Sequence, residues 1–112
     1  MFPPSVRIFV CTTPQDMRRS FDGLALAVQE RLDENPRSGS LYVFINKRAN
    51  RLKALWFDRN GYCILYKRLH QAVFVPPRST EDERPVARID AHRLAKIFAG
   101  VEQPPRIRIK WH

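Results

Sequence analysis

Six cationic side chains in the middle of the chain have the residue types and the spacing to bind phosphate groups. The chain carries 20 Lys and Arg against 11 Asp and Glu, a formal net charge of +9, and residues 41–80 contribute eight of those cations with one acid, Asp58. Cations that neutralise phosphates release counterions, and guanidinium groups bind phosphate through two hydrogen bonds, so a polyanion is the expected partner. We predict one patch that contacts the DNA backbone, made of Lys47, Arg48, Arg51, Lys53, Lys67 and Arg68. The alternative is a solvated sheet edge that its charge protects from aggregation.

The end of the chain repeats this chemistry in alternating form. Residues 106–111 read RIRIKW, so that each cation is followed by an apolar or aromatic residue. Strict alternation is typical of an edge strand, or of an arm that becomes ordered on a partner. We therefore expect further phosphate contacts from Arg106, Arg108 and Lys110.

Five aromatic residues in and beside the basic segment offer a second kind of contact. They are Tyr42, Phe44, Trp56, Tyr62 and Tyr66. Rings interleaved with cations are able to stack on unpaired bases, and an RNA-recognition domain begins with the same order of strand, helix and two strands. The basic-Gly-aromatic signature of that domain is absent, however, and large aromatics dominate the cores of small domains. We expect most of these rings to be buried.

Residues for catalysis or for metal binding are poorly placed in this sequence. Asp16, Asp22 and Asp58 are isolated carboxylates among basic residues, whereas a two-metal nuclease needs several carboxylates that converge. The three histidines lack the spacing of metal ligands, and the two cysteines are expected to be buried thiols. We predict a protein without enzymatic activity, metal or cofactor. A nuclease that uses Asp58 as a metal ligand is the weakest alternative.

The hydrophobic pattern predicts the elements that position these residues. Apolar residues three and four apart predict a long helix at 16–33, capped by Thr13 or Asp16, and a short helix at 91–99, capped by Asp90. The sequence Asn60-Gly61 is typical of a hairpin turn. Runs rich in β-branched and aromatic residues predict strands at 6–11, 41–46, 52–58, 62–69, 73–75 and 86–89.

Together these elements predict an α+β fold in a single small domain. The expected order is strand, helix, three strands that form an antiparallel meander, a short strand, and a short C-terminal helix, with the long N-terminal helix packed on the sheet. Residues 1–77 would form the core, and residues 78–112 would add a linker, the short helix and the basic tail to the same domain. No apolar run approaches the length of a membrane span, and the start of the chain does not have the pattern of a signal peptide. We expect a cytoplasmic protein with no membrane partner.

Three stretches of the chain resemble a known family of mobile-element proteins. Residues 16–24 (DMRRSFDGL) resemble its helix motif, residues 38–61 its central motif, and residues 66–76, with YKRL and a Phe before a Pro, its closing motif. The family is the TnpB-type accessory protein of the bacterial insertion sequences numbered sixty-six, which is unrelated to the RNA-guided TnpB nucleases. The resemblance covers residues 5–77 and, more loosely, the helix at 90–100. Residues 35–37, residues 70–73 and Val75 depart from the family pattern.

This resemblance implies a protein that is encoded beside a separate, larger transposase and assists movement of the element. With the charge pattern, it leads us to expect a non-catalytic, DNA-binding accessory factor that contacts phosphates at the element ends and helps the transposase to assemble there. The alternative is an adaptor of the transposase complex without DNA binding of its own. The motif residues Asp16, Arg18, Arg19 and Asp22 are expected to bridge the helix start to the sheet, or alternatively to face the transposase.

Overall fold

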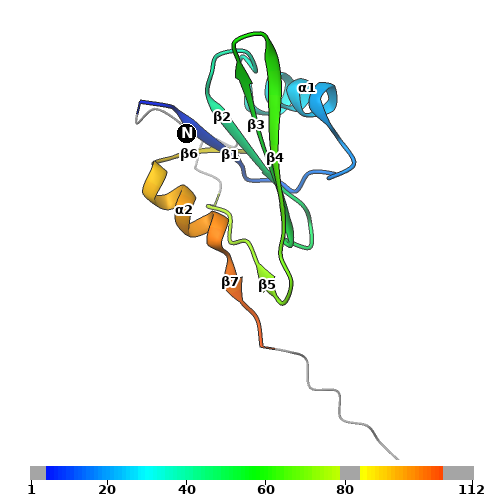
Figure 1. Ribbon diagram of the computed structural model, residues 1–112, viewed down its shortest axis with the longest axis vertical. Helices are drawn as coiled ribbons and strands as arrows, with labels where there is room; N and C mark the ends of the chain where they lie inside the picture. Colours follow the sequence, from blue (N-terminus) through cyan, green and yellow to red (C-terminus); the bar gives the residue numbers. More distant parts are fainter. Residues whose placement is uncertain (1–4, 79–83, 105–112) are drawn as a thin grey trace, which may run out of the picture.

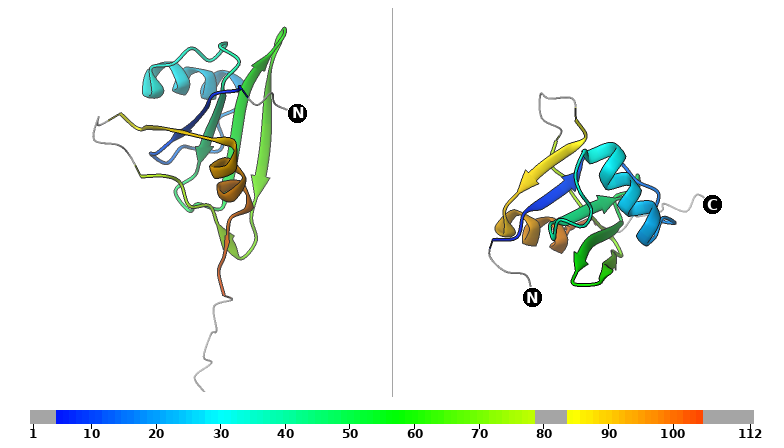
Figure 2. Two further views of the ribbon diagram at one scale, coloured as in Figure 1. Left: turned by 90° about the vertical axis from the view of Figure 1, so that its left-hand side faces the viewer. Right: turned by 90° about the horizontal axis from the view of Figure 1, so that it is seen from above.

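A five-stranded sheet lies between two helices (Figures 1 and 2) in the computed structural model, which describes residues 5–78 and 84–104. The helices are α1 (Phe21–Leu32) and α2 (Ala91–Ala99). The sheet has the strand order β4-β3-β2-β1-β6. Its strands are β1 (Ile8–Cys11), β2 (Leu41–Ile45), β3 (Arg51–Asp58), β4 (Gly61–Arg68) and β6 (Val86–Ile89). A separate two-stranded ribbon pairs β5 (Ala72–Val73) with β7 (Val101–Glu102). The predicted small α+β domain is confirmed.

The predicted antiparallel meander is formed by β2, β3 and β4. Tyr42 lies opposite Leu55 in the first of its two pairings, and Arg51 lies opposite Arg68 in the second. β1 instead runs parallel to β2, because the helical connection through α1 returns the chain to the same end of the sheet. β6 completes the sheet by pairing with β1 in the antiparallel direction.

The long N-terminal helix packs on the sheet as predicted, but it begins at Phe21 and not at residue 16. The segment before the helix makes other hydrogen bonds. The backbone amide of Gln15 donates to the Ile45 carbonyl (2.9 Å), and the Asp16 carboxylate accepts from the backbone amide of Arg18 (2.9 Å). Neither Thr13 nor Asp16 therefore caps the helix. Its N-cap is Ser20, whose side chain makes no capping hydrogen bond.

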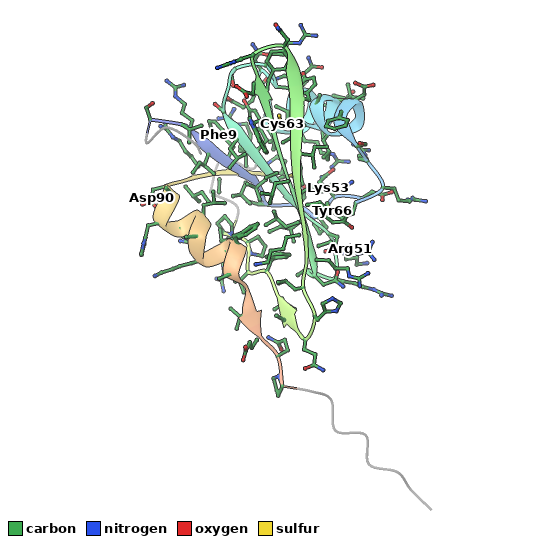
Figure 3. The ribbon with its side chains drawn as sticks, viewed as in Figure 1. Phe9, Arg51, Lys53, Cys63, Tyr66 and Asp90 are labelled. Atoms are coloured by element: carbon green, nitrogen blue, oxygen red, sulfur yellow. The ribbon has the colours of Figure 1, made fainter. Side chains whose placement is uncertain are left out.

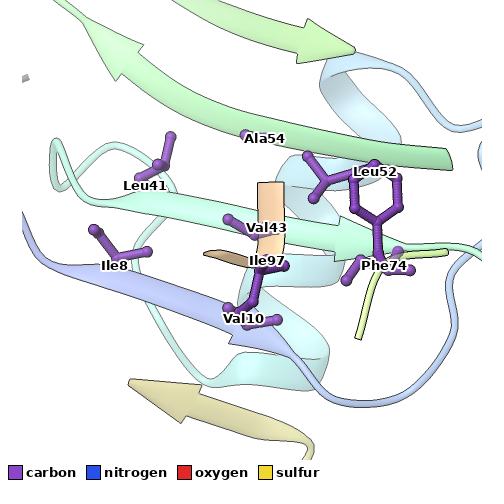
Figure 4. Close-up of a cluster of buried hydrophobic side chains, with 9 residues drawn as sticks. Ile8, Val10, Leu41, Val43, Leu52, Ala54, Phe74 and Ile97 are labelled. Atoms are coloured by element: carbon purple, nitrogen blue, oxygen red, sulfur yellow. The ribbon is translucent and has the colours of Figure 1, made fainter. Parts of the chain in front are cut away.

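Both faces of the sheet are buried, which explains the unbroken apolar run of β2. Successive side chains of a strand point to opposite faces. Tyr42 and Phe44 therefore contact the α1 side, where they are fully buried with Leu24 of the helix. Leu41, Val43 and Ile45 point to the α2 side, where Ile97 of α2 and Phe74 close a second cluster (Figure 4).

The β3–β4 hairpin and α2 form as predicted, with one difference in the turn. Asp58 pairs with Gly61, so that residues 59–60 make the turn, and Arg59 adopts the left-handed conformation (φ 56°) expected of a glycine. In α2, the Asp90 carboxylate accepts a hydrogen bond from the Arg93 amide (2.7 Å), which confirms the predicted cap. In residues 5–78 and 84–104, no helix is long and apolar enough to cross a membrane.

Candidate nucleic-acid interface

Four of the six predicted cations gather where β2 ends, β3 begins and β4 ends. Arg51 and Arg68 lie directly opposite each other on adjacent strands, and their side chains share the α1 side of the sheet. Lys47 and Arg48 are exposed in the loop that leads into Arg51. We call these four residues, Lys47, Arg48, Arg51 and Arg68, the basic end of the sheet.

The loop that carries Lys47 and Arg48 is held in place by two asparagines. The side-chain oxygen of Asn46 accepts hydrogen bonds from the backbone amides of Asn50 (3.0 Å) and Arg51 (2.9 Å). The side-chain nitrogen of Asn46 donates to Asn50 Oδ1 (2.8 Å). The Asn50 carbonyl in turn accepts from the Leu69 amide of the β4 side (2.8 Å). The loop cations are therefore presented on a fixed backbone, which lowers the entropy lost when they bind.

A hollow of about 400 Å³ separates this loop from the family helix motif. Asp16, Met17 and Arg18 line one side of it, and the other side is lined by Asn46, Lys47, Arg48, Asn50 and Arg51. Asp16 is held by Arg18: a guanidinium nitrogen lies 2.7 Å from a carboxylate oxygen, and these hydrogen bonds, with that from the Arg18 amide, lower the pKa of Asp16 to about 2. The carboxylate is thus ionised at neutral pH and bound to Arg18. It is the one carboxylate in an ion pair within residues 5–78 and 84–104.

Lys53, predicted to contact phosphate, is an internal residue of the α1 side. Its side chain is 9% exposed, and its ammonium donates to the Arg19 carbonyl (2.7 Å) and lies 5.0 Å from the centre of the Tyr66 ring. The contact ties β3 to the segment before α1. Lys53 therefore bridges the helix start to the sheet, the role that we expected of the charged motif residues.

Lys67 points to the opposite side of the sheet from Arg51 and Arg68. Its ammonium donates to the Phe98 carbonyl at the end of α2 (2.8 Å) and lies 4.3 Å from the centre of the Phe98 ring. A cation at a helix C-terminus is stabilised by the helix dipole. The structure thus separates Lys67 from the basic end of the sheet.

The remaining motif residues lie on or near α1. The Arg19 side chain packs over Gly23, since a Cβ added to this glycine would lie 3.2 Å from Arg19 Cβ. Asp22 is exposed in the first helical turn, where a negative charge complements the helix dipole. Arg106, Arg108 and Lys110 lie outside the described residues.

The five aromatics that we considered differ in exposure, and sequence reasoning did not distinguish them. Tyr42 and Phe44 are fully buried, and Trp56 is partly buried on the α2 side. Tyr62 packs edge-on against Phe57, with ring centres 5.1 Å apart. Tyr66, in contrast, is 49% exposed, and it lines a hollow of about 290 Å³ with Arg51 and Arg68. The signal for this was available: β4 is the last strand of the predicted meander, so one side of each of its residues lacks a neighbouring strand.

The acidic residues do not form a metal centre in the part of the chain that the structure describes. Residues 5–78 and 84–104 contain no group of three or more His, Cys, Asp and Glu side chains able to hold a metal ion. Asp58 lies exposed at the tip of the β3–β4 hairpin, at the far end of these strands from Arg51 and Arg68.

Comparisons with known proteins agree with the motifs. Residues 6–106 match the family model described as IS66 Orf2 like protein. The uncharacterized protein y4hO of Sinorhizobium fredii is 37% identical over 98 residues, which are 88% of this chain and 83% of that protein. The uncharacterized protein y4jC of the same organism is 37% identical over 79 residues, 69% of this chain and 68% of its own length. No solved structure matches significantly. The chain therefore belongs to the IS66 Orf2 like family, the accessory proteins of the IS66 insertion sequences.

Proposed function

We propose that this protein is a non-catalytic accessory factor of transposition that binds the DNA backbone through the basic end of its sheet and assists a separate transposase of the same element. Family membership supports the role in transposition. The proposed DNA contact rests on one observation, the placement of Arg51 directly opposite Arg68.

Two like charges that face each other across a strand pair destabilise a sheet, by up to about 1 kcal/mol. Within residues 5–78 and 84–104, no carboxylate lies within ion-pair distance of either guanidinium. Lys47 and Arg48 add two exposed charges at the same end. A phosphodiester backbone that crossed this end would relieve the repulsion and release its own counterions, so that the cost in stability is offset when DNA is bound.

A second candidate is an adaptor that contacts the transposase and has no affinity of its own for DNA. Two large apolar side chains on the outer surface of α1 favour it: Phe21 is 45% exposed and Leu26 is 48% exposed. Both side chains would supply apolar area to a contact with the transposase. The two functions are compatible, because α1 and the basic end are different surfaces.

The test is fluorescence anisotropy with a duplex of the element end and a random duplex of equal length, with and without the transposase. We expect the protein alone to bind both duplexes, and the double change Arg51→Gln with Arg68→Gln to weaken both about equally, because phosphate contacts carry no sequence information. Arg88→Gln removes one exposed cation from β6, the other edge of the sheet, and is the control for loss of a single cation away from the basic end. DNA binding that appears only when the transposase is present would support the adaptor instead.

A further inference from the structure

We propose that the hollow between Arg51, Tyr66 and Arg68 binds one unpaired base of a single-stranded nucleic acid. Tyr66 stacks on the base, and the two arginines bind the adjacent phosphates. The proposal rests on the proposed function and names the form of nucleic acid that this site takes. The hollow has a volume of about 290 Å³.

The position of Tyr66 in the sheet leaves one face of its ring available. Lys53 lies directly opposite Tyr66 on β3, and its ammonium is 5.0 Å from the ring centre, so the ring face toward β3 is occupied. Within residues 5–78 and 84–104, β4 is an edge strand, and no further strand pairs with its other side. The free side of the ring therefore opens beyond the sheet edge, which agrees with its 49% exposure.

The cations around Tyr66 have two different roles. Lys53 is 9% exposed and is held by the Arg19 carbonyl, so it fixes the inner face of the ring. Arg68 is two residues further along β4, and Arg51 is diagonal to Tyr66 on β3, so both guanidinium groups lie on the same side of the sheet as the ring. Figure 3 shows Lys53, Tyr66 and Arg51 in succession along the hairpin. An aromatic ring bordered by cations is the arrangement that binds single strands, in which each base offers a flat face and each linkage a phosphate.

A duplex cannot use this ring, because its bases are stacked on one another and paired. Arg51 and Arg68 would serve a duplex and a single strand alike, through phosphates. Tyr66 is therefore the residue that separates the two forms of nucleic acid, and its removal should affect only one of them.

The experiment compares the full chain with Tyr66→Leu and Tyr66→Phe, using fluorescence anisotropy. The probes are oligothymidylate and oligouridylate of about 12 nucleotides, within the usual site size of such proteins, and a duplex DNA of equal length. Phe21→Leu, which removes an aromatic of similar exposure from α1, is the matched control for the nucleic-acid titrations. A 2-aminopurine within the DNA single strand reports stacking directly through its fluorescence.

We expect Tyr66→Leu to weaken single-strand binding about 10-fold, within the range known for single stacking residues, and to leave duplex binding and its salt dependence unchanged. Tyr66→Phe, which keeps the ring, should retain single-strand affinity, and 2-aminopurine fluorescence should change on binding to the wild type. Comparison of the two oligonucleotides shows whether DNA or RNA is preferred.

Equal single-strand affinity for wild type and Tyr66→Leu, with duplex binding intact, would overturn this inference and leave the proposed function standing. Failure of every probe to bind the wild type would overturn both. If Tyr66→Leu spared single strands and weakened capture of the transposase, the hollow would be a protein contact. If Tyr66→Leu failed to fold, the 2-aminopurine signal with the wild type and with Tyr66→Phe would decide the question, and an unchanged signal would refute stacking.

Discussion

Arg51 and Lys53 provide a test of which cations face the solvent, because they are two residues apart on one strand and on the same side of the sheet. Sequence alone makes them equivalent. In the structure, Arg51 is partly exposed beside Arg68, whereas the Lys53 ammonium is bound to the Arg19 carbonyl at 2.7 Å. We therefore expect Arg51→Gln and Lys53→Met to affect different properties of the protein.

For Lys53→Met, we expect a loss of stability. A hydrogen bond to a charged group contributes about 1.5–3 kcal/mol, and the contact with the Tyr66 ring adds about 0.5–1 kcal/mol. Part of this loss in free energy is offset, because the buried ammonium no longer has to be desolvated on folding. The expected net loss is about 2 kcal/mol in the free energy of unfolding, or roughly 10 °C in the melting temperature of a domain of this size.

For Arg51→Gln, we expect stability to change by less than about 0.5 kcal/mol, because the change also removes repulsion from Arg68. DNA binding should weaken, and the slope of log K against log salt concentration should become shallower by about 0.9, the value for one phosphate contact. Lys53→Met should leave this slope unchanged.

The assays are urea or thermal unfolding followed by circular dichroism, and anisotropy titrations at several salt concentrations. The opposite pairing of results would refute our assignment. If Lys53→Met reduced the salt slope without a change in melting temperature, Lys53 would be a phosphate contact. If Arg51→Gln lowered the melting temperature and spared the slope, Arg51 would be a structural residue.

Three further predictions concern the fold that supports the basic end. Gly100→Ala should lower the free energy of unfolding by about 2–3 kcal/mol, because φ is 78° and an added Cβ would lie 2.7 Å from the Leu69 side chain; Gly61→Ala, with no atom within 4 Å of its added Cβ, should change it little. Burial raises the pKa of Tyr42 above its usual value of about 10, so the folded state holds this proton more tightly than the unfolded state, and stability should fall as pH rises above about 10; Tyr42→Phe should make this alkaline loss smaller in urea unfolding measured at several pH values. Asp90→Ala removes the cap of α2 and should cost about 1 kcal/mol in the same assay, and an unchanged midpoint would mean that the cap does not stabilise the helix.

The sequence predicted most of the strands because their signals are local. The Asn-Gly turn and the runs of β-branched and aromatic residues specified the β3–β4 hairpin, and the Asp90 cap specified the start of α2. The start of α1 was wrong because its determinants are not local. The apolar spacing includes Met17, which is buried in the α1-side cluster without being helical, since the Gln15 amide pairs with the carbonyl of Ile45 on a distant strand.

The basic end could be located from the sequence, but its membership could not. In the structure, Lys53 lies on the same side of the sheet as Arg51, and Lys67 lies on the opposite side. The charge pattern of the sequence could not supply the position of the two helices. The Arg19 carbonyl and the Phe98 carbonyl, which take up the two ammonium groups, come from segments more than 30 residues away in the chain.

Lys67 and Arg68 are neighbours in β4 and point to opposite sides of the sheet. The length of the β3–β4 turn therefore determines which cation faces which side. Lys67 joins the sheet to the end of α2, while Arg68 belongs to the basic end on the other side. Inserting one residue between Arg59 and Asn60 and shifting β4 by one position would place Lys67 opposite Arg51 and Tyr66 opposite Leu52, since each step along a strand reverses the side chain. Lysine would then take the solvent-facing position of Arg68, and Tyr66 would meet the end of α2 in place of Lys67. Natural variation in this family should therefore tolerate substitutions at the hairpin tip far better than insertions or deletions of a single residue.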